Sequence, residues 1–137
     1  MRYESIADIF SANRKIREGL EIVLGGVSPE EAARVPDEGG WSIQQIVEHI
    51  SLVDGGTAKI CGRLLDVARA DNKPSDGRFE LSDDFNRLSD TASEAKFQAP
   101  ERVQPTGDVA VTTSTAKLAE STAAIEAMQP DMERLDL

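Results

Sequence analysis

Apolar side chains recur every three or four residues along the first stretch of the chain, from about Tyr3 to Leu24. They form a single stripe, with the charged side chains on the opposite side, as in an amphipathic helix. Gly25 and Gly26 follow, and glycine commonly supplies the left-handed residue that closes a helix. The pattern therefore predicts a first long helix. Its apolar positions are Ile6, Ile9, Phe10, Ile16, Leu20, Val23 and Leu24.

A short helix is predicted directly after the first long one. Ser28 can cap its start, Pro29 suits the first helical position, and Glu31 completes a capping box with that serine. Because Pro36 follows so closely, only one or two helical turns can form. Residues 37–40 combine acidic residues with two glycines and have the composition of a turn.

A second long helix is predicted to begin after Ser42, which forms another capping box with Gln45. Gly55, Gly56 and Gly62 interrupt its broad apolar face. They are compatible either with a close crossing against another helix or with a bend, and the sequence leaves both interpretations open. The apolar positions are Ile43, Ile46, Val47, Ile50, Val53, Ile60, Cys61, Leu64, Leu65 and Ala68.

The rest of the chain predicts a shorter helical segment, an irregular stretch and a last long helix. Apolar residues at helical spacing indicate the shorter segment from Leu81 to Ala95. Residues 95–108 contain two prolines and a glycine and should be irregular or extended. The last helix is expected to begin near residues 112–115, where the run TTST offers capping side chains. Pro130 should end or kink this helix.

The fold class follows from these elements. No segment alternates between apolar and polar residues as a half-buried strand does. We therefore predict an all-α fold, an up-down helix bundle with three long helices and one or two short ones. A chain of 137 residues suits a single domain over residues 1–137. The low aromatic content, 4%, suits a core of Ile, Leu, Val and Ala between helices.

Charge and composition narrow the classes of partner. The chain has 25 acidic and 15 basic residues, a net charge of −10, and no cluster of Lys and Arg. Nucleic-acid binding needs such a basic surface, so we expect no nucleic-acid partner. No apolar run approaches the roughly 20 residues that span a bilayer, and the N-terminal residues do not form a signal peptide. A single cysteine, Cys61, suits a reducing compartment. We therefore expect a cytoplasmic protein without a membrane partner.

The only histidine, His49, lies eight residues after the only tryptophan, Trp41. On the predicted helix it falls at the edge of the apolar face, beside Gln45, Val53 and Gly56. One interpretation is a partly buried packing residue with one hydrogen bond. The other is a metal ligand, although one imidazole cannot complete a site of three histidines and carboxylates would have to substitute.

Asp54 falls close to the centre of the same apolar face, where an ionised carboxylate needs a partner. It can face a groove, pair with a basic residue such as Arg14 or Lys15, or help to hold a metal. Cys61 has the pattern of a small buried hydrophobe, and Trp41 that of a packing residue before a helix start. A candidate ligand pocket on this face comprises Trp41, Gln45, His49, Val53 and Asp54.

Two stretches resemble a known family. Residues 40–50, GWSIQQIVEHI, resemble the signature of the DinB-like (YfiT-like) superfamily, in which a tryptophan–serine helix start precedes a helix with an inward-facing histidine. Residues 97–107, FQAPERVQPTG, are similar to the proline-containing loop before the third long helix of that family. The order of predicted elements matches over nearly all 137 residues.

The resemblance implies a four-helix bundle. In active relatives it implies a divalent metal, zinc or nickel, held by three histidines, with hydrolase, isomerase or thiol-transferase chemistry. His49 matches the first of these ligands, and the other two belong to a histidine pair on a fourth long helix. This sequence ends at Leu137, about where that helix is expected. The resemblance therefore implies a shortened bundle in which His49 belongs to an incomplete metal site.

A bundle without one of its members leaves apolar surface uncovered, and large exposed apolar patches are uncommon in soluble monomers. We therefore predict a homodimer with two-fold symmetry.

Three functions remain open at this stage. The first is a non-catalytic bundle that serves as a structural, binding or dimerisation module, with no cofactor. The second is a metal-dependent hydrolase or thiol transferase that uses His49 as one ligand. The third is a small-ligand binder that uses the pocket beside Trp41, Gln45 and His49.

Overall fold

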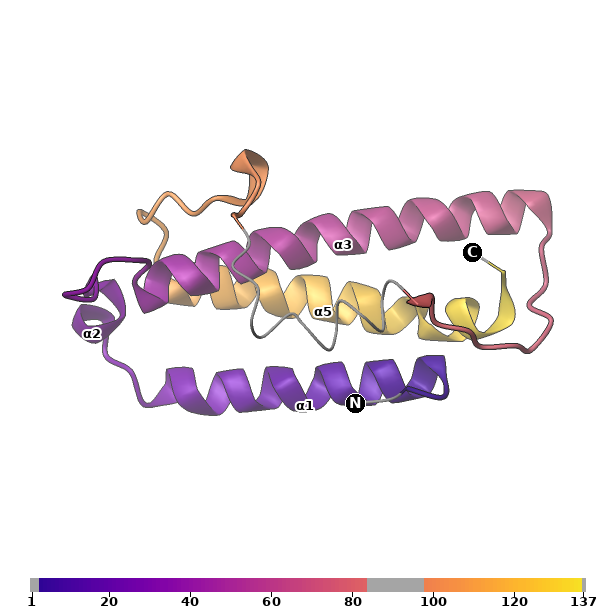
Figure 1. The fold of residues 1–137 in the computed structure, drawn as a ribbon, viewed down its shortest axis with the longest axis horizontal. Coiled ribbons are helices and arrows are strands. Elements are labelled where there is room, and N and C mark those ends of the chain that lie inside the picture. Colours follow the sequence, from indigo (N-terminus) through magenta and orange to yellow (C-terminus); the bar gives the residue numbers. More distant parts are fainter. Residues whose placement is uncertain (1–2, 84–97, 137) are drawn as a thin grey trace.

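The computed structural model describes residues 3–83 and 98–136 (Figure 1). Within these ranges the chain has no β-strand and forms three long helices, α1 (Ile6–Gly25), α3 (Ile43–Asp71) and α5 (Val111–Arg134). Two short elements accompany them, α2 (Pro29–Ala33) and the 3-10 helix η1 (Glu101–Val103). The predicted all-α bundle with three long helices is confirmed. The segment predicted from Leu81 to Ala95 lies outside the described residues from position 84 onward.

The closest packing in the bundle is between α3 and α5, which run side by side over most of their lengths (Figure 1). α1 packs against α5, while α2 and η1 pack against α3. A buried cluster at one end of the bundle consists of Leu65, Ala68 and Leu135, with Met128 and Met132 against it. No helix in the part of the chain that the structure describes is long and apolar enough to cross a bilayer.

Local capping signals account for the starts of the first three helices. Ser5 caps α1 by accepting a hydrogen bond from the N–H of Asp8. Both predicted capping boxes are present: Ser28 with Glu31 at α2, and Ser42 with Gln45 at α3. The predicted left-handed end of α1 is wrong, because the residue after the helix, Gly26, has φ −96°. No positive φ is therefore needed there.

α3 runs as one helix through its three glycines. A Cβ atom added at Gly55 would lie 3.7 Å from the Ser121 hydroxyl, and one at Gly62 would lie 3.7 Å from the Met128 methyl. These two glycines therefore face α5, which favours the close helix crossing over the bend. α3 ends at Asp71, and the residue after it, Asn72, is left-handed with φ 50°.

The start of α5 differs from the sequence prediction, and of the two predicted effects of Pro130 the structure contradicts termination of the helix. The helix starts after Ala110, and no side chain caps it. The run TTST lies inside the first turns, where Ser114 is fully buried, so its predicted capping role is wrong. At the other end the helix continues through Pro130 to Arg134, so the proline does not terminate it.

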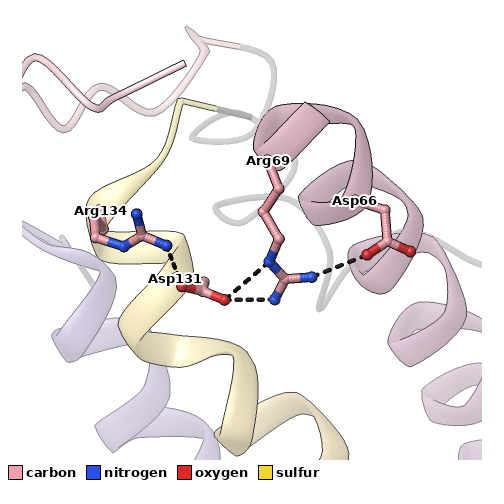
Figure 2. Close-up of polar contacts among 4 residues, drawn as sticks. All are labelled: Asp66, Arg69, Asp131 and Arg134. Carbon is pink, nitrogen blue, oxygen red and sulfur yellow. Dashed lines mark hydrogen bonds and ion pairs between the residues drawn. The ribbon is translucent and has the colours of Figure 1, made fainter. Parts of the chain in front are cut away.

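A charged network joins the far ends of α3 and α5 (Figure 2). The Asp131 carboxylate accepts hydrogen bonds from Arg69 on α3, at 2.5 Å and 3.2 Å, and from Arg134, at 2.8 Å. Arg69 also donates to Asp66 at 2.9 Å. The bonds from Arg134 and then Arg69 lower the pKa of Asp131. These contacts hold the end of α5 against α3 beyond Pro130.

Candidate functional site

His49 lies on α3 and is half-buried. Its Nδ1 atom is 2.6 Å from the carbonyl oxygen of Val103. A carbonyl oxygen only accepts, so Nδ1 carries the proton and donates this bond. The ring also packs against Trp41, with ring centroids 5.0 Å apart and planes tilted by 53°. The imidazole is thus held between Trp41, which precedes the capping residue of α3, and the stretch around η1.

Glu48, the neighbour of His49, is a buried carboxylate that the sequence reasoning missed. Its side chain belongs to a residue only 4% exposed. One oxygen accepts from the N–H and the hydroxyl of Thr106, at 3.0 Å and 2.9 Å, and the other accepts from the N–H of Gly107 at 2.9 Å. Burial raises the pKa of Glu48, but these bonds, with the Lys117 charge, outweigh it and lower the pKa overall. The carboxylate is therefore ionised and fixes the 103–107 stretch on α3.

Further contacts hold the same stretch on the first turns of α3. The side-chain amide of Gln44 donates to the carbonyl oxygen of Gly107 at 2.6 Å. Gly107 has φ 84°, and a Cβ there would lie 3.3 Å from the Gln45 amide nitrogen. Gln45 itself accepts from the N–H of Ser42 in the capping box. Residues 44–49 and 103–107 are therefore joined along their length, and Gly107 approaches α3 closely.

A cavity of about 630 Å³ opens between α3 and residues 98–103. Trp41, His49 and Val53 line it, so the structure brings three of the five predicted pocket residues together. Gln45 does not line it, because its side chain serves the start of α3. Asp54 points away from it toward α1. The opposite wall, which includes Pro100 and Val103, could not be assigned from the sequence.

Asp54 pairs with Arg17 of α1, and the two charged groups are 2.5 Å apart. The predicted pairing of Asp54 with a basic residue is confirmed, but the partner is neither of the two examples, Arg14 and Lys15; Arg14 pairs instead with Glu126 of α5 at 3.0 Å. The Arg17 and Asp54 side chains are only 17% and 13% exposed. Burial raises the pKa of Asp54, and the Arg17 charge and hydrogen bond offset only part of this increase.

A second cavity, of about 360 Å³, lies beside this ion pair, between α1, α3 and α5. Cys61 lines it and is half-buried. Burial raises the pKa of the Cys61 thiol, and a backbone hydrogen bond offsets only part of the increase. The thiol therefore stays protonated, and no residue within the described ranges activates it, in keeping with a packing role.

The residues around His49 do not fit the divalent metal that the family resemblance implies. The Nδ1 bond to a backbone carbonyl is common for a metal-ligating histidine, and it leaves Nε2 free. However, no group of three His, Cys, Asp or Glu side chains within residues 3–83 and 98–136 has the geometry of a metal site. The cavity beside His49 is instead lined by Lys59, Arg63 and Arg102, whose charges repel a cation.

The fold and this site define a class: a helix bundle with a side pocket between its longest helix and a loop fixed on that helix. No family model matches the chain. No curated protein and no solved structure matches it either.

Proposed function

We propose that this protein is a non-catalytic binding module with a DinB-like bundle, and that a small molecule binds in the pocket beside Trp41 and His49. The observation that carries the proposal is the pocket itself. Its volume of about 630 Å³ lies within the range of roughly 300–1,000 Å³ that is usual for small-molecule sites. An aromatic pair forms one wall and the stretch of residues 98–103 the other.

The contacts between two distant stretches support the DinB-like part of the proposal. The resemblance rests on residues 40–50 and 97–107, and the described parts of these stretches contact each other directly. His49 bonds to Val103, and Glu48 bonds to Thr106 and Gly107. Two motifs that are separated in sequence but form one site are what a shared architecture requires.

Binding suits this site better than catalysis. One ring nitrogen of His49 is used in the hydrogen bond to Val103, and the single thiol of the chain, Cys61, lines the second cavity instead. The alternative of a metal-dependent hydrolase or thiol transferase would gain support if zinc or nickel were recovered in stoichiometric amount and lost in His49→Ala.

Binding of a neutral aromatic probe tests the proposed pocket. We expect phenylnaphthylamine to quench the fluorescence of Trp41, the only tryptophan, in a saturable way, because the indole ring lines the cavity. Gly56→Leu should abolish this quenching, since Gly56 lines the cavity and has open space around it. The measurement is a fluorescence titration with energy transfer to the bound probe.

Gly19→Leu is the matched control for this titration. Gly19 is also a helical glycine with open space around it, but it lies on α1 and does not line the pocket. Each replacement removes about 1 kcal/mol of helix cost, so neither should unfold the bundle. Equal quenching in both variants, or none in the original protein, would contradict the proposed pocket.

We also propose that the protein is a homodimer, and the observation that favours it is the uncovered face of α1. Ile16 is 63% exposed and Val23 is 64% exposed. These residues are seven positions apart and share one side of the helix. Ile16 also lines the cavity between α1, α3 and α5. A second copy placed here would remove this apolar surface from water.

Light scattering after size exclusion tests the dimer. We expect a mass of about twice 14.8 kDa at micromolar concentration. Ile16→Glu should reduce it to the mass of one chain, because a charge would enter the apolar interface. Ile22→Glu is the matched control: Ile22 is 78% exposed but lies about 120° around the same helix. A single-chain mass for the unmodified protein would contradict the dimer.

A further inference from the structure

The pocket beside Trp41 has a charge opposite to that of the whole chain. Lys59 and Arg63 of α3 and Arg102 of η1 line it. Among the described residues, no aspartate or glutamate lines it; Glu101, next to Arg102, does not. The whole chain has 25 acidic residues and only 15 basic ones. Three cations without an acid are therefore a local departure from the average composition.

These three cations form none of the ion pairs between described parts of the chain. Lys59, Arg63 and Arg102 take part in no ion pair with any residue in ranges 3–83 and 98–136. Most of the other described basic residues do, as the pairs of Arg17 and Arg69 illustrate. The three side chains are exposed, so their charges are available to a ligand at the mouth of the cavity.

The positions of the cations allow them to converge on one group. Lys59 and Arg63 are four residues apart on α3, so their side chains are neighbours on one face of the helix. Arg102 belongs to the opposite wall, which is held on α3 by the His49–Val103 bond. An acidic group between the two walls would meet positive charge from both sides.

Much of the remaining lining of the same cavity is apolar. Trp41, Val53 and Ile60 line it, and each of the three is more than one third exposed. This surface offers an aromatic ring and two branched side chains to the body of a ligand. The cavity therefore has a charged part and an apolar part side by side.

We propose that the pocket recognises a small anion with an apolar or aromatic body, such as an organic carboxylate, phosphate or sulfonate. This inference rests on the proposed binding function and specifies the class of its ligand. Lys59, Arg63 and Arg102 bind the acidic group, and Trp41 and Ile60 contact the body. The net charge of −10 disfavours extended polyanions, because they would also approach the acidic remainder of the surface.

The experiment compares two probes that share one aromatic body. Anilinonaphthalenesulfonate carries a sulfonate, and phenylnaphthylamine is its neutral counterpart. We expect Lys59→Gln/Arg63→Gln to weaken binding of the sulfonate by about tenfold or more, since hydrogen bonds to charged groups contribute strongly. Binding of the neutral probe should change by less than about twofold, because the apolar wall is intact. A higher salt concentration should weaken the binding of the sulfonate probe but not that of the neutral probe.

A second double variant controls for net charge. Lys15→Gln/Arg34→Gln removes the same two charges from exposed positions that do not line the pocket. It should leave the affinities of both probes unchanged. Equal loss of both probes in the pocket variant, or equal loss of the sulfonate in the two double variants, would overturn the anion proposal while the pocket stands. If neither probe binds the original protein, the proposed binding function fails as well.

Discussion

Glu48→Ala is expected to lower the free energy of unfolding by about 3 kcal/mol. The alanine would leave the N–H groups of Thr106 and Gly107 without their acceptor, in a place where the carboxylate is 4% exposed. The loss is limited because Thr106 is exposed and water can replace part of the bonding. Urea unfolding followed by circular dichroism measures the change. Glu120→Ala, an exposed acid on α5, should cost less than about 0.5 kcal/mol.

The pH dependence of stability separates the charge of Glu48 from its packing. Its pKa is lowered from the ordinary value of 4.5, so the folded protein binds the proton less readily than the unfolded chain does. The stability from this carboxylate is therefore fully present above pH 4.5 and lost as the pH falls through the folded-state pKa. Glu48→Gln should remove this contribution, so that the free energy of unfolding falls less steeply at acidic pH. If this fall is unchanged in the variant, other carboxylates control acid unfolding.

Asp54→Leu is expected to lower the free energy of unfolding by about 3 kcal/mol. The double variant Arg17→Met/Asp54→Leu should have a free energy of unfolding within about 1 kcal/mol of that of the original protein, or higher. The single change leaves the guanidinium of Arg17 enclosed without its ion-pair partner among the described residues. Its Nε atom is already buried without a hydrogen bond there. The double change removes both charges. Chemical denaturation of the four members of this cycle gives the coupling energy.

The pH dependence of Asp54 runs opposite to that of Glu48. Burial raises the pKa of Asp54 above its ordinary value of 3.8 despite Arg17, so folding favours the protonated form. The stability gained by protonation is present below pH 3.8 and is lost as the pH rises through the folded-state pKa. Arg14→Met is the control, since the Arg14–Glu126 pair is 51% and 41% exposed and should contribute less than about 1 kcal/mol. If the free energy of unfolding of the double variant were far below that of either single variant, this account would be contradicted.

The helix starts that the sequence predicted are those with local causes. Ser28 with Glu31 and Ser42 with Gln45 need only residues three positions apart, so their chemistry is legible in the sequence. The start of α5 has no such cause, because Ala110 provides no capping side chain. Its position depends on packing against α3, whereas the sequence predicts the start at the nearest serine and threonine residues.

The ion pair of Asp54 shows a different limit. The sequence indicated that this inward carboxylate needs a partner, but it offered several cations on the first helix. Arg14 and Arg17 point about 60° apart around the helix, so which of them reaches Asp54 depends on how α1 is rotated against α3. A single chain without its tertiary structure does not specify that rotation.

Only part of the candidate site could be predicted from the sequence, for the same reason. His49 and Val53 share one face of α3 and Trp41 lies just before that helix, so their common pocket follows from their spacing. Glu48 was missed because its donors lie 58 and 59 residues further along the chain. The one available signal was the turn at Thr106 and Gly107, where adjacent N–H groups can surround an anion.

The bonds of Glu48 also bear on how the protein assembles. Glu48 is synthesised 58 residues before Thr106. All residues of α3 are therefore synthesised while the carboxylate still lacks its hydrogen-bond donors. Until they arrive, the carboxylate keeps its hydration shell, because an ionised group is not desolvated without compensation. The 103–107 stretch can therefore close over α3 only after Thr106 and Gly107 have been synthesised, and we expect a nascent chain interrupted before Thr106 to leave this part of α3 open and hydrated.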